Sequence, residues 1–167
     1  MATTAATAPP VRLTLEGLAA TEALARRIAA CARPGDVIAL WGPLGAGKTA
    51  FARAFIAACA EAEGAKPEEV PSPTFTLVQT YPFARFTVHH FDLYRVSNAV
   101  ELNELGFEDA LGGVSLIEWP ERGAALLPAD RLDIALAPGN APETRMAEIT
   151  PHGSWRLRIR ADDLTRN

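Results

Sequence analysis

The sequence predicts a three-layer α/β/α fold in which helices cover both faces of a mostly parallel central sheet. Two observations predict it. Short apolar runs, of the length that buried strands have, alternate with segments of helical periodicity. A glycine-containing loop at residues 42–49 joins one of these runs to a helical segment. With 167 residues, 49% of them apolar, the chain is long enough to fold as one such domain around its own core.

The first half of the chain contains two predicted strands and two predicted helices. Residues 11–15 alternate apolar and polar side chains, which is typical of a strand with one buried face. Residues 21–32 have a helical pattern that ends before Pro34. The apolar run 37–41 is typical of a buried parallel strand, and residues 50–62 carry apolar side chains along one face of a helix.

The second half is predicted to complete the sheet after a charged, proline-containing loop. Strands are expected at short apolar or alternating runs, and a helical segment is expected where the apolar spacing lengthens. The predicted elements are strands at 75–81 and 86–91, a helical segment at 97–111 broken at Gly106, and strands at 114–118, 131–137, 144–150 and 155–160.

One domain is predicted over residues 11–160, with a disordered leader at 1–10 and a flexible tail at 161–167. The leader has no basic residue before an apolar stretch, so it does not have the pattern of a secretory signal. No apolar run is long enough for a membrane-spanning helix, and we expect no membrane partner. Cys31 and Cys59 lack metal-ligand spacing, which favours a reduced, cytoplasmic location.

The charge of the chain argues against a broad nucleic-acid-binding face. The formal net charge is −4, whereas contacts to phosphate backbones need clustered Lys and Arg. The one basic stretch, residues 156–160, alternates Arg with Leu157 and Ile159. This alternation favours a strand with one wet face over a polyanion site.

Residues 42–49 read Gly-Pro-Leu-Gly-Ala-Gly-Lys-Thr and match the phosphate-binding pattern G-x-x-x-x-G-K-[ST]. The pattern follows a predicted strand and opens a predicted helix, so backbone N–H groups and the helix dipole point at one site. Lys48 is expected to neutralise the β- and γ-phosphates, and Thr49 to bind Mg²⁺. The predicted fold is therefore a P-loop NTPase-like domain. The predicted nucleotide-binding residues are Pro43, Leu44, Gly45, Ala46, Gly47, Lys48, Thr49 and Ala50.

Two acidic residues end predicted strands at the edge of the sheet where ligands bind. Asp92 follows the run 86–91, and Glu118 ends the run 114–118. Phosphoryl transfer needs a carboxylate near the metal ion and a group that positions water. Either acid could take these roles, and a solvated carboxylate at a strand end is the alternative for each one alone.

Two other segments near these acids carry polar side chains. Ser72 and Thr74, on either side of Pro73, could sense the γ-phosphate as a switch segment does, although an ordinary turn is favoured on these residues alone. His89 and His90 alternate across a predicted strand, so at most one of them faces the site, and a structural histidine is favoured over a metal ligand.

Three further side chains flank the predicted site or its strands. Trp41 and Trp119 lie beside the predicted site, with core packing as the default role for each. Arg131, just ahead of a predicted strand, could approach the base of the nucleotide.

The nucleotide is predicted to be ATP. No Asn-Lys-x-Asp or Thr-Lys-x-Asp sequence occurs, so guanine recognition of the usual GTPase kind has no support. The chain also lacks an Arg-rich lid segment of the kind that small nucleotide kinases close over two substrates.

Four motifs in series resemble the TsaE family, also called YjeE. They are the loop 42–49, Ser-Pro-Thr-Phe at 72–75 with Tyr81, His-Phe-Asp-Leu-Tyr-Arg at 90–95, and Leu-Ile-Glu-Trp-Pro at 116–120. The resemblance covers about residues 12–137, and it anchors neither the leader nor the later part of the chain.

The resemblance implies a small bacterial ATPase needed to form N6-threonylcarbamoyladenosine (t6A) at position 37 of tRNAs that read codons beginning with A. Such a protein uses ATP with Mg²⁺ and releases ADP. It binds the TsaB–TsaD pair and supports turnover of that transferase without transferring the group itself. It meets tRNA only indirectly, through the complex.

The resemblance also assigns roles within the motifs. It makes Lys48 the phosphate-binding lysine, Thr49 and Glu118 the protein ligands of Mg²⁺, and Asp92 an acid close to the metal ion or the attacking water. It favours a switch role for the hydroxyls of the 72–75 motif. The predicted catalytic residues are Lys48, Asp92 and Glu118, and the predicted switch or partner-facing residues are Ser72, Thr74, Tyr94, Arg95 and Trp119.

Two other functions stay open at this point. A small-molecule kinase could use the same loop with Asp92 as its base. A nucleotide-gated binding protein could use the loop with hydrolysis as an incidental activity.

Overall fold

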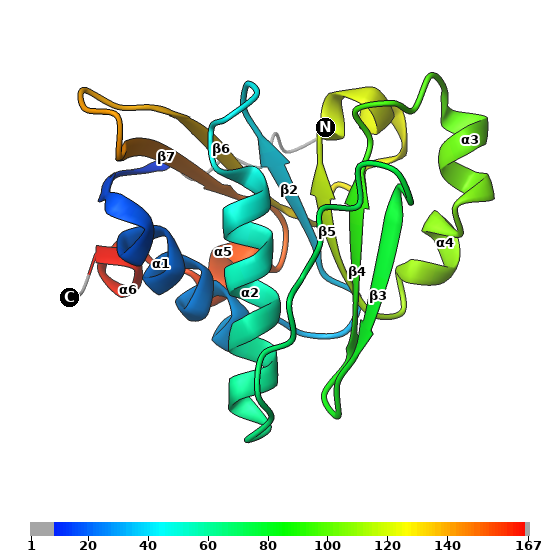
Figure 1. The fold of residues 1–167 in the computed structure, drawn as a ribbon, viewed down its shortest axis with the longest axis horizontal. Coiled ribbons are helices and arrows are strands. Elements are labelled where there is room, and N and C mark those ends of the chain that lie inside the picture. The colour runs from blue at the N-terminus through cyan, green and yellow to red at the C-terminus, as the bar shows by residue number, and fades with distance from the viewer. Residues whose placement is uncertain (1–8, 166–167) are drawn as a thin grey trace, which may run out of the picture.

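The computed structural model describes residues 9–165, and the expected leader at 1–10 lies almost entirely outside them. The described residues form a seven-stranded sheet in the order β1-β7-β6-β2-β5-β4-β3 (Figure 1). The strands are β1 (Val11–Glu16), β2 (Val37–Trp41), β3 (Val78–Pro82), β4 (Thr87–Asp92), β5 (Val114–Glu118), β6 (Leu132–Pro138) and β7 (Thr144–Pro151). The helices are α1 (Gly17–Cys31), α2 (Lys48–Ala62), α3 (Ala99–Glu104), α4 (Phe107–Ala110), η1 (Pro120–Leu126), α5 (Trp155–Arg158) and α6 (Ala161–Thr165).

The centre of the sheet is parallel and its outer strands are antiparallel. β2 pairs in parallel with both β5 and β6, and β4 pairs in parallel with β5. The outer pairs β1–β7, β6–β7 and β3–β4 are antiparallel. The carboxyl ends of β2, β4 and β5 therefore meet at one edge, where open α/β sheets bind their ligands.

The larger core lies between the sheet and the helices α1 and α2, which Figure 1 shows on the near face. Phe51 and Phe55 of α2 are spaced by one helical turn, and both are fully buried in this core. Ile38 and Leu40 of β2 point into the same core. Helix α2 therefore packs against β2, the strand that precedes the loop 42–49.

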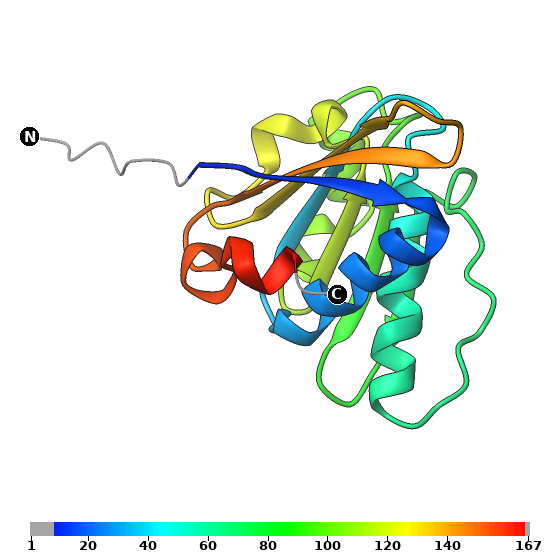
Figure 2. The ribbon, with the colours of Figure 1, turned by 90° about the vertical axis from the view of Figure 1, so that its left-hand side faces the viewer.

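The second face of the sheet carries a smaller core beneath α3, α4 and η1. Val37, Phe91 and Ile117, from three neighbouring strands, pack here with Phe107 of α4. The rings of Phe91 and Phe107 meet edge to face, with centroids 5.7 Å apart. Figure 2 shows α1 and η1 on opposite sides of the sheet. The predicted three-layer, P-loop NTPase-like fold with a mostly parallel central sheet is confirmed.

The prediction of a strand at 155–160 is wrong, because the segment forms the short helix α5. Trp155 and Ile159 are buried, while Leu157 is 87% exposed. Buried side chains at positions i and i+4 lie on one face of a helical turn, whereas a strand would bury Leu157 together with Trp155 and Ile159. The expected strand at 75–81 also begins later, at Val78, since residues 73–76 form a turn.

Most of the expected flexible tail at 161–167 lies within the described residues, and its flexibility stays a prediction. Residues 161–165 form α6, in which Leu164 is buried against the larger core. Arg27 of α1 donates a hydrogen bond to the Leu164 carbonyl at 2.7 Å. The folded unit therefore extends past residue 160. Within residues 9–165, no helix combines the length and the apolar character needed to cross a bilayer.

Candidate functional site

The loop between β2 and α2 has a backbone path that glycine makes possible. Gly42 has φ +139°, and a Cβ built there would lie 2.2 Å from the Leu136 carbonyl oxygen of β6. Gly47, directly before α2, is left-handed with φ +104°. Glycine adopts these conformations without the strain that other residues would have. The loop can therefore wrap closely around the amino end of the 15-residue helix α2. This is the geometry in which backbone N–H groups cradle phosphate.

Lys48 places a buried ammonium group inside this loop. Its Nζ donates to the carbonyl oxygens of Gly42 and Pro43 at 2.6 and 2.8 Å, and lies 3.9 Å from the centroid of the Trp119 ring. Burial lowers the pKa of Lys48, and the nearby carboxylates, foremost Glu118, oppose that shift. A phosphate group would offer this ammonium a stronger partner than two neutral carbonyls.

Thr49 and Glu118 meet in the same place from α2 and β5. The Thr49 hydroxyl donates to Glu118 Oε2 at 2.8 Å, and the other carboxylate oxygen, Oε1, lies 2.8 Å from Nε2 of His90. Only 2% of Glu118 is exposed. The sheet register sets this contact, since Glu118 ends β5 directly beside Asp92 of β4.

Asp92 ends a short chain of polar contacts that begins in the 72–75 motif. Ser72 Oγ lies 2.7 Å from Thr74 Oγ1, and Thr74 Oγ1 donates to Asp92 Oδ2 at 3.3 Å. The backbone N–H of Tyr94 donates to Asp92 Oδ1 at 3.0 Å. The hydroxyl pair is therefore connected to the acid on the strand beside Glu118.

Trp119 turns the chain sharply after β5. It is one of two residues other than glycine with positive φ in the described chain, at φ +57°. Its ring contacts both the Lys48 ammonium and the Tyr94 ring, whose centroid is 4.8 Å away. Arg95 points elsewhere, with its guanidinium 5.7 Å from the centroid of the exposed Phe75 ring.

These groups line one open cavity of about 320 Å³. Its lining includes most of the predicted site: Leu44, Gly45, Ala46, Gly47, Lys48, Thr49, Ala50, Ser72, Thr74, Asp92, Glu118 and Trp119. Pro43, Tyr94 and Arg95 are not in this lining. The structure thus brings the predicted residues together, and their roles stay predictions.

The cavity suits a phosphate chain with a hard cation. It joins an ammonium group and a helix amino end to hydroxyl and carboxylate oxygens, which are the ligand atoms that Mg²⁺ prefers. Among residues 9–165, no group of three or more His, Cys, Asp or Glu could hold a metal ion by itself.

Two other predicted candidates lie outside the cavity. Arg131 donates to both carboxylate oxygens of Asp133, at 2.9 and 3.2 Å, and to the Pro128 carbonyl. The Trp41 indole also donates to Asp133, at 3.0 Å. Neither side chain lines the candidate site.

His90 is the site residue whose part the sequence did not reveal. The alternation along β4 puts His90 on the same face as Asp92 and puts His89 on the other. The parallel register then brings His90 next to Glu118. The period of two along the strand could have selected His90, but its partner depends on the pairing of β4 with β5.

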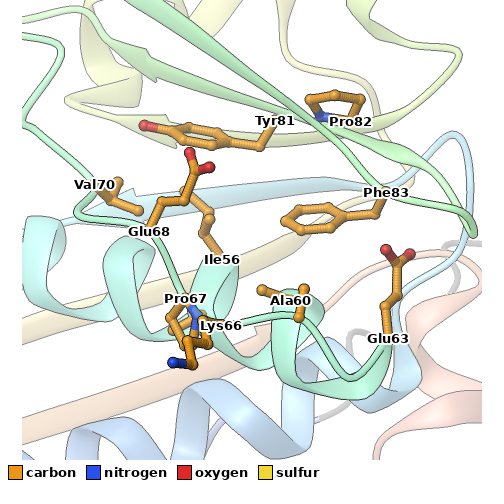
Figure 3. Close-up of a pocket in the computed structure, with 12 residues that line it drawn as sticks. Ile56, Ala60, Glu63, Lys66, Pro67, Glu68, Val70, Tyr81, Pro82 and Phe83 are labelled. Atoms are coloured by element: carbon orange, nitrogen blue, oxygen red, sulfur yellow. The ribbon is translucent and has the colours of Figure 1, made fainter.

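A second cavity, also of about 320 Å³, lies between α2, the loop 63–70 and the β3–β4 turn (Figure 3). Ile56, Val70, Tyr81 and Phe83 form much of its wall, with Glu68 beside the Tyr81 ring. None of the predicted site residues lines it.

Comparisons with known proteins agree with one another. A family model described as threonylcarbamoyl adenosine biosynthesis protein TsaE matches residues 15–147. The tRNA threonylcarbamoyladenosine biosynthesis protein TsaE of Rickettsia conorii is 40% identical over 141 residues, which are 83% of this chain and 78% of that protein. The protein of the same name from Bacillus subtilis is 36% identical over 150 residues, or 88% of this chain and 89% of that protein. The crystal structure of YdiB from Bacillus subtilis matches with a TM-score of 0.73 and 29% identity, over 94% of this chain and 95% of that one.

Proposed function

Because this chain belongs to the TsaE family, which acts in tRNA threonylcarbamoyladenosine biosynthesis, we propose that it is the Mg²⁺-dependent ATPase of that pathway. The observation that carries the proposal is the contact of Thr49 with Glu118 beside Lys48 in the loop cavity. Three groups that phosphoryl transfer needs, a cation for phosphate and two oxygen ligands for a metal ion, meet there.

Each residue has a defined part in binding. The loop N–H groups and Lys48 hold the phosphates, and Lys48 exchanges the Gly42 and Pro43 carbonyls for phosphate oxygens. Thr49 and Glu118 would hold the metal ion through oxygen. When bound, ATP would supply the phosphoanhydride bond and Mg²⁺ would neutralise charge on its phosphates. ATP is preferred to GTP because the chain has no guanine-recognition sequence.

Asp92 and the hydroxyls of the 72–75 motif position the attacking water. Asp92 is 5% exposed, and its Oδ2 accepts a hydrogen bond from Thr74. A carboxylate held in this way is suited to orient water and to accept its proton. The Ser72–Thr74 pair would respond to the γ-phosphate and relax once ADP remains.

The partners follow from the pathway. We propose that this ATPase binds TsaB and TsaD and supports their turnover in forming t6A at position 37 of tRNAs that read codons beginning with A. Direct tRNA binding by this chain alone is disfavoured, because its formal net charge is −4 with Lys48 and Lys66 as its only lysines. The free thiols of Cys31 and Cys59 accord with a cytoplasmic setting.

ATP turnover by the purified chain, alone and with TsaB and TsaD, tests this function. We expect slow hydrolysis alone and stimulation by the pair. Lys48→Ala should abolish nucleotide binding, because Lys48 contacts the phosphates. Glu118→Ala should retain much of the nucleotide binding and lose hydrolysis, because Glu118 is the proposed ligand of the metal ion. Absence of stimulation would count against the proposal. If t6A formation survived in Glu118→Ala, a nucleotide-gated binding protein would be favoured, and a phosphorylated small-molecule acceptor would favour a kinase.

A further inference from the structure

His90 is a buried histidine with a single hydrogen bond. Its side chain is 0% exposed, and Nε2 lies 2.8 Å from Glu118 Oε1. Its other ring nitrogen, Nδ1, is buried without a hydrogen-bond partner among the described residues. Since Nδ1 has nothing to donate to, Nε2 is the nitrogen that carries the proton and donates to the carboxylate.

Packing does not account for an imidazole at this position. A buried polar atom without a partner costs free energy, and an apolar side chain of similar size would fill the same space without that cost. Of its two neighbours along this face of β4, Asp92 belongs to the candidate site, and Val88 is apolar and fully buried. What the imidazole adds to an apolar side chain here is its contact with Glu118.

That contact acts on a carboxylate that needs orienting. The parallel register puts Asp92 directly opposite Glu118, and like charges in such a pair repel each other. His90 holds Oε1 of Glu118 from β4, and Thr49 holds Oε2 from α2. The two contacts fix the plane of the carboxylate, and they leave Oε2 as the oxygen that faces the phosphate-binding loop.

We propose that His90 is a positioning residue for Mg²⁺ binding: by donating to Glu118 Oε1, it keeps Oε2 turned toward Thr49. This inference rests on the proposed function, in which Glu118 and Thr49 are the protein ligands of Mg²⁺. Hydrogen bonds to the non-ligating atoms of a metal ligand commonly tune affinity in this way.

The test compares His90→Leu, His90→Gln and Glu118→Gln in the full chain with a matched control, His89→Leu. His89 is adjacent on β4 but lies on the opposite face of the sheet, away from Glu118. For each protein, calorimetry gives the affinity for a non-hydrolysable ATP analogue without Mg²⁺ and at increasing Mg²⁺ concentrations. ATP turnover over the same Mg²⁺ range is a second measurement, and thermal melting controls for folding.

We expect His90→Leu to bind the Mg²⁺-free analogue as the parent chain does, but to need about 10- to 100-fold more Mg²⁺. His90→Gln should recover most of this loss, since its amide nitrogen can donate from nearly the same place. His89→Leu should match the parent chain, and Glu118→Gln should lose the Mg²⁺ response.

Two results would overturn the inference. One is an unchanged Mg²⁺ requirement in His90→Leu. The other is a loss of Mg²⁺-free binding and melting temperature in His90→Leu that His90→Gln does not restore, which indicates a structural role only. If the affinity of the parent chain for the ATP analogue changes with Mg²⁺ but the chain hydrolyses no ATP, the proposed function fails. The affinity titration then still decides the role of His90. An unchanged Mg²⁺ response in Glu118→Gln would reject the ligand assignment and this inference with it.

Discussion

Gly42 is the residue at which the loop comes closest to the neighbouring strand. Its φ of +139° and the 2.2 Å separation between a built Cβ and the Leu136 carbonyl oxygen leave no room for a side chain. Strand β6 therefore packs directly against the first residue of the loop and limits the side chain that this position can hold. Gly45 offers a contrast, because it is also left-handed, at φ +76°, yet a Cβ there meets nothing within 4 Å.

Gly42→Ala is expected to destabilise the fold by about 2–4 kcal/mol, through backbone strain combined with a steric clash. Gly45→Ala, the matched control, should cost about 1 kcal/mol, because it adds conformational strain alone. Equilibrium unfolding in urea measures both values. Equal losses in the two variants would contradict the close approach of the loop to β6.

At this scale the sequence predicted the residues of the loop but not the contacts of their neighbours. Lys48 and Thr49 follow from a local pattern, since their roles depend on the loop and the helix that contain them. The partner of His90 and the positive φ of Trp119 depend on strand pairing and on the path of the chain after β5. Neither is encoded within a few adjacent residues.

Helix α5 shows why element type is uncertain in short segments. Over residues 155–160 the apolar side chains fit a period of two as well as a spacing of four, and too few turns exist to decide. Burial of Trp155 and Ile159 decides in favour of the helix. Arg158 then reaches back to Asp36, where its Nη2 donates to Oδ1 at 2.6 Å, and links α5 to the turn before β2.

Aspartate substitutions in α5 and at Ile159, the residue directly after it, distinguish the helix from a strand. Leu157→Asp should change the free energy of unfolding by less than about 0.5 kcal/mol, because Leu157 is 87% exposed. Ile159→Asp should cost about 3 kcal/mol or more, since it buries a charge in the core. Thermal or urea unfolding measures the difference. Large losses in both variants would restore the strand, in which Leu157 and Ile159 share the buried face.

The other elements were predictable because their patterns are longer or have clear boundaries. Helix α2 starts at the glycine loop and repeats its apolar face over 15 residues. β2 and β5 are short apolar runs that are buried on both faces of the sheet. The loop after α2 was also predicted, but the turn at 73–76 shortened the strand expected beside it.

The whole molecule brings the candidate site together from segments far apart in the chain. The loop, the 72–75 motif, Asp92 and Glu118 share one cavity because the ends of β2, β4 and β5 meet at one edge. The α/β alternation predicted that edge. The antiparallel strands that extend the sheet on both sides came from the structure, because strand order is a property of long-range pairing.

Nucleotide binding should therefore stabilise the whole fold. A non-hydrolysable ATP analogue with Mg²⁺, at about 100 times its dissociation constant, is expected to add about 2.7 kcal/mol to the free energy of unfolding. For a domain of this size, that corresponds to a rise of about 5–10 °C in melting temperature. Differential scanning fluorimetry measures the shift. Lys48→Ala is the control, and a shift that persists in this variant would contradict the role of the lysine.

The order of strands also bears on how the protein folds as it is made. In the described chain β1, the first strand, pairs with β7, from Val11 opposite Ile149 to Glu16 opposite Thr144. A ribosome must release the chain through β7 before β1 meets its partner, whereas β2, α2, β4 and β5 can assemble earlier. The half of the sheet that holds the site can thus form before β7 has emerged, while the other half must close afterwards.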